Sequence, residues 1–155
     1  MQLTIIGVGS RMPGWVASGF EEYRRRLPKP ILPHLIEIPL ANRQKNQNAI
    51  SAKEKEGAAI LKKLDDRDYV VALDISGQSM KTIELADKLL RWQEEALKIS
   101  ILIGGPDGIC ETCLSRADLL WSLSDLTLPH TLVRVMIMEQ IYRAWSMNIR
   151  HPYHR

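Results

Sequence analysis

Several features that define common protein classes are missing from this 155-residue chain. No apolar run approaches the length of a membrane-spanning helix, and no internal repeat or low-complexity segment is present. Hydrophobic residues make up 45% and charged residues 25%, a balance that argues against wholesale disorder. We therefore expect a single domain, residues 1–155, with a substantial core.

A targeting segment is also missing from the start of the chain. Met1 to Gly7 lacks the basic region of a secretory signal peptide and leads directly into the pattern of a buried strand. Together with the absence of a membrane span, this predicts a cytoplasmic protein with no membrane partner.

Cysteine is scarce and forms a single C-x-x-C pair, Cys110 and Cys113. No second pair and no nearby histidine complete a zinc site, so we expect no metal. The pair could serve redox chemistry if a helix N-terminus lowered the pKa of the first thiol. We favour the alternative, that both are partly buried structural residues on a short helix.

The fingerprints of common nucleotide sites are incomplete. Residues 7–12 supply the first two glycines of G-x-G-x-x-G, but Met12 stands at the third position. The G-x-x-x-x-G-K-[ST] motif of phosphate-binding loops is absent, and no nucleophile elbow is visible. These gaps argue against NAD, nucleoside triphosphates and serine-dependent hydrolysis.

The net charge of +3 is small, but basic residues gather in three places. They are Arg24 to Arg26 with Lys29, Arg43 with Lys45, and the tail at 150–155. Such clusters can attract a polyanion, and the first two could contact RNA phosphates. Because Glu21 and Glu22 lie beside the first cluster, the charges alone favour a solvated, neutralised face.

Apolar periodicity predicts strands that alternate with helices. We expect strands at 2–8, 34–39, 69–74, 99–103 and about 118–122, and helices at 13–27, up to about Leu64, from Thr82, at 110–116 and at 131–147. Residues 40–56 are predicted as a mobile loop entering a helix, and residues 75–78 as a turn. Alternation of this kind predicts an α/β fold with a mainly parallel sheet and helices on both faces.

The predicted final helix is apolar on all sides, so it needs cover from more than one direction. Its apolar residues are Leu132, Val133, Val135, Met136, Ile137, Met138, Ile141, Tyr142, Ala144 and Trp145. We expect a homodimer formed through this helix. The alternative is a central helix fully buried within one chain.

Two loops in the last third, one containing glycine and proline and the other containing proline alone, predict a ligand pocket. One is residues 103–108, directly after the strand at 99–103, and the other is residues 123–130. Glycine lets the backbone turn sharply and approach a ligand closely. Since ligands of open α/β sheets bind at the carboxyl ends of strands, we expect a cofactor pocket built largely from main chain.

Short motifs follow one another in a specific order along the whole chain. The last third contains IGGPDG at 103–108, WSLS at 121–124, TLPH at 127–130, LVRV at 132–135, EQIYRA at 139–144 and HPYHR at 151–155. Earlier segments include Met12-Pro13 with Trp15, EIP at 37–39, EKEG at 54–57, and Leu73-Asp74 with Gly77. In this order the motifs resemble the RlmH family.

The resemblance implies a SPOUT-class methyltransferase that uses S-adenosyl-L-methionine and modifies a pseudouridine of 23S ribosomal RNA in the assembled ribosome. It also implies a C-terminal trefoil knot and a homodimer. The family pattern places cofactor contacts at Leu73, Gly104, Leu123, Ser124, Asp125, Leu126, Thr127 and Leu128. Leucine side chains suit the flat faces of adenine, and the loop backbone suits its polar edges.

The implied reaction transfers a methyl group to N3 of pseudouridine, whose proton must leave as the nucleophile forms. We expect Arg143, Tyr153, His154 and Arg155 to grip and activate the base. Glu139 and Arg134 would orient them, since Glu139 and Arg143 lie four residues apart on one helix face. The remaining alternatives are another RNA target such as transfer RNA, a noncatalytic ribosome-binding factor and a small redox protein.

Overall fold

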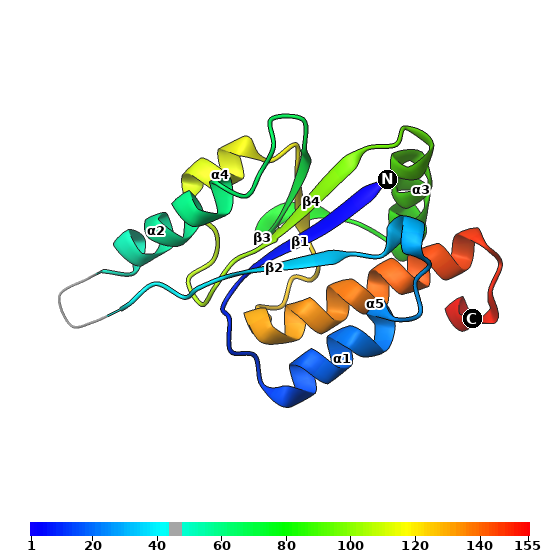
Figure 1. Cartoon of the computed structure of the whole chain (residues 1–155), viewed down its shortest axis with the longest axis horizontal. Coiled ribbons are helices and arrows are strands. Elements are labelled where there is room, and N and C mark those ends of the chain that lie inside the picture. The colour runs from blue at the N-terminus through cyan, green and yellow to red at the C-terminus, as the bar shows by residue number, and fades with distance from the viewer. Residues whose placement is uncertain (44–47) are drawn as a thin grey trace.

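A computed structural model describes residues 1–43 and 48–155. In this part of the chain, five strands form one sheet in the order β2-β1-β4-β3-β5, with every neighbouring pair parallel (Figure 1). The strands are β1 (Gln2–Val8), β2 (His34–Ile38), β3 (Tyr69–Ser79), β4 (Lys98–Ile103) and β5 (Leu119–Ser122). The predicted α/β fold with a parallel sheet is therefore confirmed.

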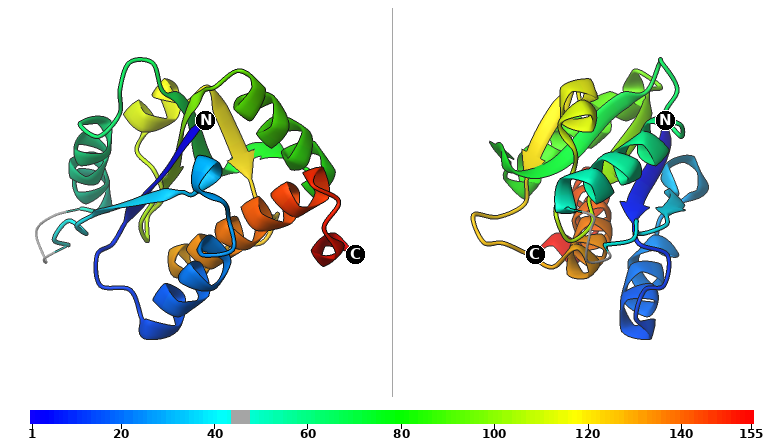
Figure 2. Two further views of the ribbon diagram at one scale, coloured as in Figure 1. Left: turned by 45° about the vertical axis from the view of Figure 1, so that its right-hand side comes forward. Right: turned by 90° about the vertical axis from the view of Figure 1, so that its left-hand side faces the viewer.

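Helices cover both faces of this sheet, as expected (Figure 2). One face holds α1 (Gly14–Arg24), α3 (Thr82–Glu94) and α5 (His130–Asn148), and the other holds α2 (Ala49–Leu61) and α4 (Glu111–Arg116). Alternating residues of β1 separate the two cores: Leu3 and Ile5 pack on the first side, Ile6 and Val8 on the second. Two short 3₁₀ helices, η1 (Lys29–Ile31) and η2 (Pro152–His154), complete the elements.

The polar segment predicted as a loop, residues 40–56, becomes helical earlier than expected. Asn48 caps α2, because its side-chain oxygen accepts a hydrogen bond of 2.8 Å from the backbone N–H of Ser51. Residues 44–47, including Lys45 of the second basic cluster, lie outside the described residues.

The turn predicted at residues 75–78 is wrong, since β3 extends to Ser79, although residues 74–77 do not take part in its pairing with β5. Both Leu73 and Gln78 pair with Trp121 of β5, so a bulge between them shifts the register. Gly77 makes this possible: a Cβ atom there would lie 2.7 Å from backbone atoms of Leu120 and Trp121. The glycine that suggested a turn instead lets two strands meet at short range.

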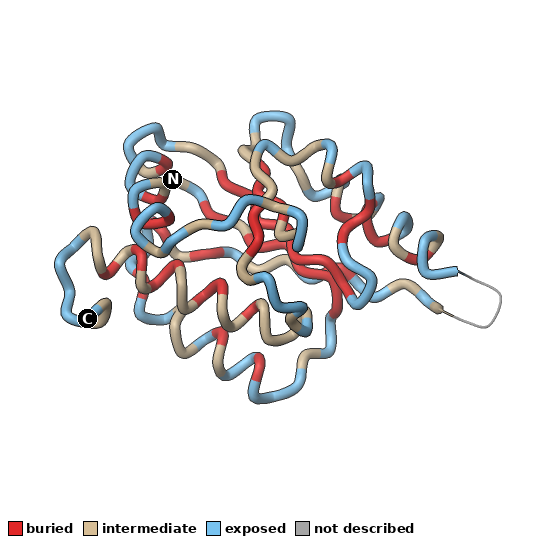
Figure 3. The backbone as a smooth tube through the Cα atoms, turned by 180° about the vertical axis from the view of Figure 1, so that it is seen from behind, coloured by how far each residue is buried: buried red, intermediate tan, exposed pale blue. Residues whose placement is uncertain are grey.

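Helix α5 is neither a surface helix nor fully buried within one chain (Figure 3). Ile137, Met138 and Ile141 are buried against the sheet and its neighbouring helices. Other apolar residues stay partly exposed, namely Leu132, Val133, Val135, Met136 and Trp145. The alternative of complete burial in one chain is therefore wrong, while the homodimer and the trefoil knot stay predictions.

None of the helices in the described residues is long and apolar enough to cross a membrane.

Replacing Gly77 with alanine tests the close contact of β3 and β5. The new Cβ would displace backbone rather than a flexible side chain, so Gly77→Ala should lower the free energy of unfolding by about 1–3 kcal/mol. Gly14→Ala is the control, because no atom of the described residues lies within 4 Å of the added Cβ. Chemical denaturation that leaves both variants equally stable would contradict this account.

Candidate active site

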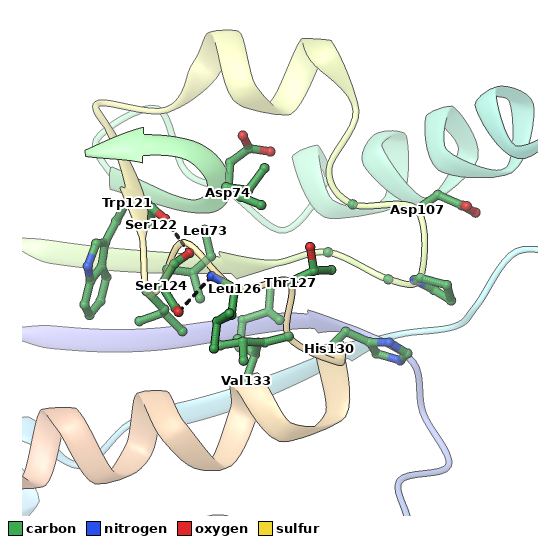
Figure 4. Close-up of a pocket in the computed structure, with 18 residues that line it drawn as sticks. Leu73, Asp74, Asp107, Trp121, Ser122, Ser124, Leu126, Thr127, His130 and Val133 are labelled. Carbon is green, nitrogen blue, oxygen red and sulfur yellow. Dashed lines mark hydrogen bonds between the residues drawn. The ribbon is translucent and has the colours of Figure 1, made fainter. Parts of the chain in front are cut away.

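A pocket of about 310 Å³ lies where β4 and β5 end, beside the extension of β3 (Figure 4). Its walls come from the loop at 104–108, the loop at 122–128 and the start of α5. The volume is at the lower end of the range for small-molecule sites. The carboxyl edge of the sheet thus holds a cavity in the place that the two loops predicted.

Most residues predicted to contact a cofactor line this pocket. Seven do so: Leu73, Gly104, Leu123, Ser124, Leu126, Thr127 and Leu128. Asp125 does not line it, although its neighbours in the same loop do. Several lining residues were not among the predicted cofactor contacts: Asp107 and His130 lie in the two predicted loops, whereas Asp74, Trp121 and Val133 lie outside them.

The loop after β5 is held by its own serines. The Ser122 hydroxyl donates to the backbone oxygen of Ser124 at 3.1 Å, and the Ser124 hydroxyl accepts from the backbone N–H of Leu126 at 3.0 Å (Figure 4). This turn leaves Leu126 73% exposed beside the pocket. A large apolar side chain in that position offers a surface that a bound ligand can cover.

The loop after β4 folds back on itself. The Gly108 N–H donates to the backbone oxygen of Gly105 at 3.0 Å, and Gly108 has a φ of 83°. A Cβ on Gly104 would lie 2.6 Å from the backbone carbon of Gly108. All five residues from Gly104 to Gly108 line the pocket, so main chain forms much of this wall, as predicted.

His130 begins α5 and lines the same pocket. Burial lowers the pKa of His130, the positive charges of Arg134 and Arg43 lower it further, and Glu56 opposes them. The imidazole is therefore neutral near pH 7, with one nitrogen able to donate and the other to accept a hydrogen bond.

Arg134 lies one turn further along α5 and is only 1% exposed. Its Nη2 atom donates to the backbone oxygens of Val8 at 3.2 Å and Gly9 at 2.6 Å, and its Nη1 atom lies 3.7 Å from Glu37. The prediction that Arg134 orients the C-terminal tail is wrong, because the guanidinium is bound to the end of β1.

A second polar cluster surrounds Glu139, at the middle of α5. Its Oε1 atom accepts from Arg143 Nε at 2.7 Å and from the Tyr153 hydroxyl at 3.1 Å. The predicted pair of Glu139 and Arg143 is thus confirmed. The Arg143 guanidinium also lies over the Tyr153 ring, 4.9 Å from its centre.

The ionisation of this cluster follows from its contacts. The hydrogen bond to Glu139 raises the pKa of Arg143, so the side chain is a permanent cation. Burial raises the pKa of Tyr153, and hydrogen bonds to Tyr23 and Glu139 raise it further. Tyr153 therefore stays protonated near neutral pH, and its hydroxyl group donates a hydrogen bond to Glu139.

The last two candidates follow Tyr153 directly. His154 has a buried Nδ1 atom with no hydrogen-bond partner among residues 1–43 and 48–155. Arg155 is exposed at the end of the chain. The structure thus brings Glu139, Arg143 and Tyr153 into contact, with His154 and Arg155 extending from them.

The pocket lies at the start of α5 and the C-terminal tail follows its end, with Glu139 midway along the helix (Figure 1). Arg143 follows His130 by 13 positions, which corresponds to roughly 20 Å along the helix axis. The described lining of the pocket includes none of Glu139, Arg143, Tyr153, His154 and Arg155. Within one chain, the tail is therefore separate from the cavity.

Nearby acids pair with the arginines of two predicted basic clusters. Arg24 pairs with Glu21 at 3.4 Å, and Arg25 and Arg26 both pair with Glu22. In the second cluster, Arg43 pairs with Glu56 and Asp107 and is therefore turned toward the protein rather than toward a phosphate. The structure supports the interpretation of a neutralised face.

The cysteines behave as structural residues. Cys110 and Cys113 are both free and buried, at 4% and 0% exposure. Burial raises the pKa of Cys113 to about 12, so its thiol stays protonated. In the described residues, no group of three or more His, Cys, Asp or Glu side chains is arranged to hold a metal ion.

The neutral state of His130 can be tested by NMR titration, with His130→Gln used to assign its signal. We expect a midpoint below 6.5, the value of an unperturbed histidine. Because the unfolded chain then binds a proton first, the contribution of His130 to folding stability is fully present above pH 6.5. It is lost as the pH falls through the folded pKa. A midpoint at or above 6.5 would contradict the structure.

Comparison with known proteins extends these observations to the whole chain. The family model described as "Predicted SPOUT methyltransferase" matches residues 1–154. Ribosomal RNA large subunit methyltransferase H from Saccharophagus degradans is 49% identical over 155 residues, covering 100% of both chains. The protein of the same name from Hahella chejuensis is 47% identical and covers 100% of this chain and 99% of the relative.

Solved structures support the fold. A methylase family protein from Neisseria gonorrhoeae aligns with a TM-score of 0.54 at 13% identity, covering 91% of this chain and 81% of that one. TrmJ from Z. mobilis ZM4 aligns with the same TM-score and identity, covering 93% and 70%. With similarity of this kind in fold and over the full length of the sequence, the chain belongs to the SPOUT methyltransferases, in the RlmH family of ribosomal RNA large subunit methyltransferase H.

Proposed function

We propose that this enzyme transfers a methyl group from S-adenosylmethionine to N3 of a pseudouridine in 23S ribosomal RNA. The observation that carries the proposal is full-length identity of 45–49% to four proteins named ribosomal RNA large subunit methyltransferase H. We therefore prefer an enzyme of this class to two of the alternatives, a noncatalytic ribosome-binding factor and a redox protein. The assembled ribosome is the proposed substrate, and the cytoplasm the proposed location.

The pocket at the sheet edge suits the cofactor in both size and chemistry. Leu73, Leu123 and Leu126 provide apolar surface for the adenine ring, and the backbone of the 104–108 loop provides polar groups for its edges. When bound, the cofactor supplies an activated methyl group on its sulfonium centre. The lining residues would bind and orient it so that the methyl group faces the nucleobase.

The tail cluster suits the nucleobase. Arg143 is a permanent cation and can stabilise negative charge that develops as N3 loses its proton. Glu139 already accepts hydrogen bonds from Arg143, Tyr153 and Gln140, so its role is to orient these side chains. His154 has an unpartnered buried nitrogen, Nδ1, among the described residues and is our candidate for direct contact with the base.

A homodimer would bring the two halves together. The pocket and the tail lie at opposite ends of α5, and the same helix carries apolar residues that one chain leaves partly exposed. We propose that these residues meet a second copy and that the partner's tail completes each pocket. In a twofold dimer this exchange is reciprocal, so both sites are equivalent.

The proposed reaction predicts both a cofactor complex and a missing modification. The purified protein should bind S-adenosylmethionine in isothermal titration calorimetry. Mass spectrometry of ribosomal RNA fragments from a deletion strain should show the loss of one methyl group from a pseudouridine. The wild-type gene should restore it, as should Asp87→Asn at an exposed position of α3, whereas Gly104→Ala should not, because its Cβ collides with Gly108. Unchanged modification in the deletion strain would refute the proposal.

The composite site predicts recovery of activity when two inactive variants are mixed. Gly104→Ala damages the pocket, and a chain ending at Arg150 lacks the tail, so each homodimer should be inactive. Random exchange of subunits makes half of the dimers mixed, each with one intact pocket facing one intact tail, which restores about a quarter of wild-type activity. Co-expression of the two variants measures this. No recovery in mixed dimers that are shown to form would mean that each chain uses its own tail.

A further inference from the structure

Arg43 lies behind the loop at 104–108 and holds it to two other segments. Its Nε atom donates to Asp107 Oδ2 at 2.8 Å, and its Nη1 atom donates to Glu56 Oε1 at 2.6 Å and to the backbone oxygen of Ala41 at 2.8 Å. Asp107 belongs to the pocket wall, whereas Arg43 and Glu56 do not line the pocket. One guanidinium thus connects the cofactor loop to α2 and to the chain after β2.

Glu56 is the buried end of this connection, with 2% exposure. Its Oε1 atom also accepts from the backbone N–H of Ala41 at 3.0 Å. Its Oε2 atom lies 3.4 Å from the position that a Cβ on Gly105 would occupy. A buried carboxylate is costly unless it is paired, so Glu56 strongly favours the position of Arg43 that also reaches Asp107.

The loop needs support of this kind because of its composition. Gly104, Gly105 and Gly108 leave its backbone free to adopt many conformations, and ordering it on binding would cost affinity. Its internal hydrogen bond between Gly105 and Gly108 closes the turn but does not fix where the turn lies. The contact from Arg43 to Asp107 joins the turn to α2 through Glu56.

We propose that Arg43 and Glu56 are positioning residues that hold the 104–108 loop, through Asp107, in the shape that binds the cofactor. They set cofactor affinity without touching the cofactor. The inference rests on the proposed function, since it takes the pocket to be the S-adenosylmethionine site. It also assigns Arg43 to contacts within the protein rather than to RNA phosphates.

The geometry makes arginine specific at this position. The guanidinium presents Nε and Nη1 in a fixed plane, so it reaches Asp107 and Glu56 at the same time. Lysine keeps the positive charge but offers a single ammonium group on a flexible chain. Arg43→Lys therefore separates the effect of geometry from the effect of charge, and Asp107→Asn weakens the same contact from the other side with almost no change in volume.

The experiment measures binding and kinetics of Arg43→Lys, Asp107→Asn and the double variant, with Asp87→Asn as the control. We expect each single variant to raise the Kd and KM for S-adenosylmethionine roughly tenfold, with kcat and the KM for ribosomes unchanged. The double variant should have the same Kd for S-adenosylmethionine as either single variant, because both substitutions remove the same contact between Arg43 and Asp107. Asp87→Asn should match the wild type.

A second measurement needs no cofactor. Hydrogen exchange of the Gly108 amide, which donates to Gly105, should be faster in Arg43→Lys and Asp107→Asn than in the wild type. The exchange of amides in β1 and α5 should stay the same, which distinguishes local release of the loop from general destabilisation.

Three results would overturn the inference. A raised KM for ribosomes with an unchanged cofactor Kd would make Arg43 an RNA contact. A roughly hundredfold loss in the double variant would mean that the two residues act independently and that Asp107 touches the cofactor itself. If cofactor affinity and exchange of the Gly108 amide are both unchanged, the contact between Arg43 and Asp107 does not position the 104–108 loop. If the wild-type protein itself fails to bind S-adenosylmethionine, the proposed function is refuted, and this inference, which rests on it, is refuted as well.

Discussion

The rigidity of α5 is the constraint on which the arrangement of the site depends. The helix runs from His130 to Asn148 without interruption, so it separates the pocket at its start from the Glu139 cluster and the tail beyond it. A helix of this length cannot bend to bring its own ends together, and the short tail folds back onto Glu139 through Tyr153. In the proposed dimer, each active site takes its pocket from one copy and its tail from the other. The proposed dimer thereby removes the separation between the cofactor pocket and the residues proposed to hold the nucleobase.

Arg134 attaches the start of this helix to the sheet. Its buried guanidinium binds the carbonyl oxygens of Val8 and Gly9, where the end of β1 presents partial negative charge, and Glu37 of β2 lies close by. A Cβ on Gly7 would lie 2.9 Å from Arg134 Nη2. The glycines of Gly7-Val8-Gly9, which resemble half of a dinucleotide fingerprint, therefore leave room for an arginine of the same chain rather than for a phosphate.

Regular elements could be predicted from the sequence because their signals are local. Local apolar runs located β1 at residues 2–8 and α5 to within one residue at each end. Features that depend on distant partners could not be found in this way. Gly77 belongs to a strand because Leu120 and Trp121 lie beside it. Arg134 points inward because it donates a hydrogen bond to the backbone oxygen of Gly9, and Arg43 does so because it pairs with Glu56. The residues that line the pocket were predicted better than Arg43 and Arg134, which hold the surrounding segments in place. Seven lining residues followed from the order of motifs, and only Asp125, in the same loop, does not line the cavity.

The distribution of paired charges explains how a chain with a net charge of only +3 can serve an RNA substrate. The arginines at 24–26 pair with Glu21 and Glu22, and Arg43 pairs with Glu56 and Asp107. The third basic cluster, residues 150–155, includes the exposed Arg150 and Arg155. Because a polyanion is attracted most strongly by positive charge that is not already neutralised, we propose the tail as a point of RNA contact. The segment that would complete the partner's pocket is thus also the one whose charge can draw the nucleobase toward it.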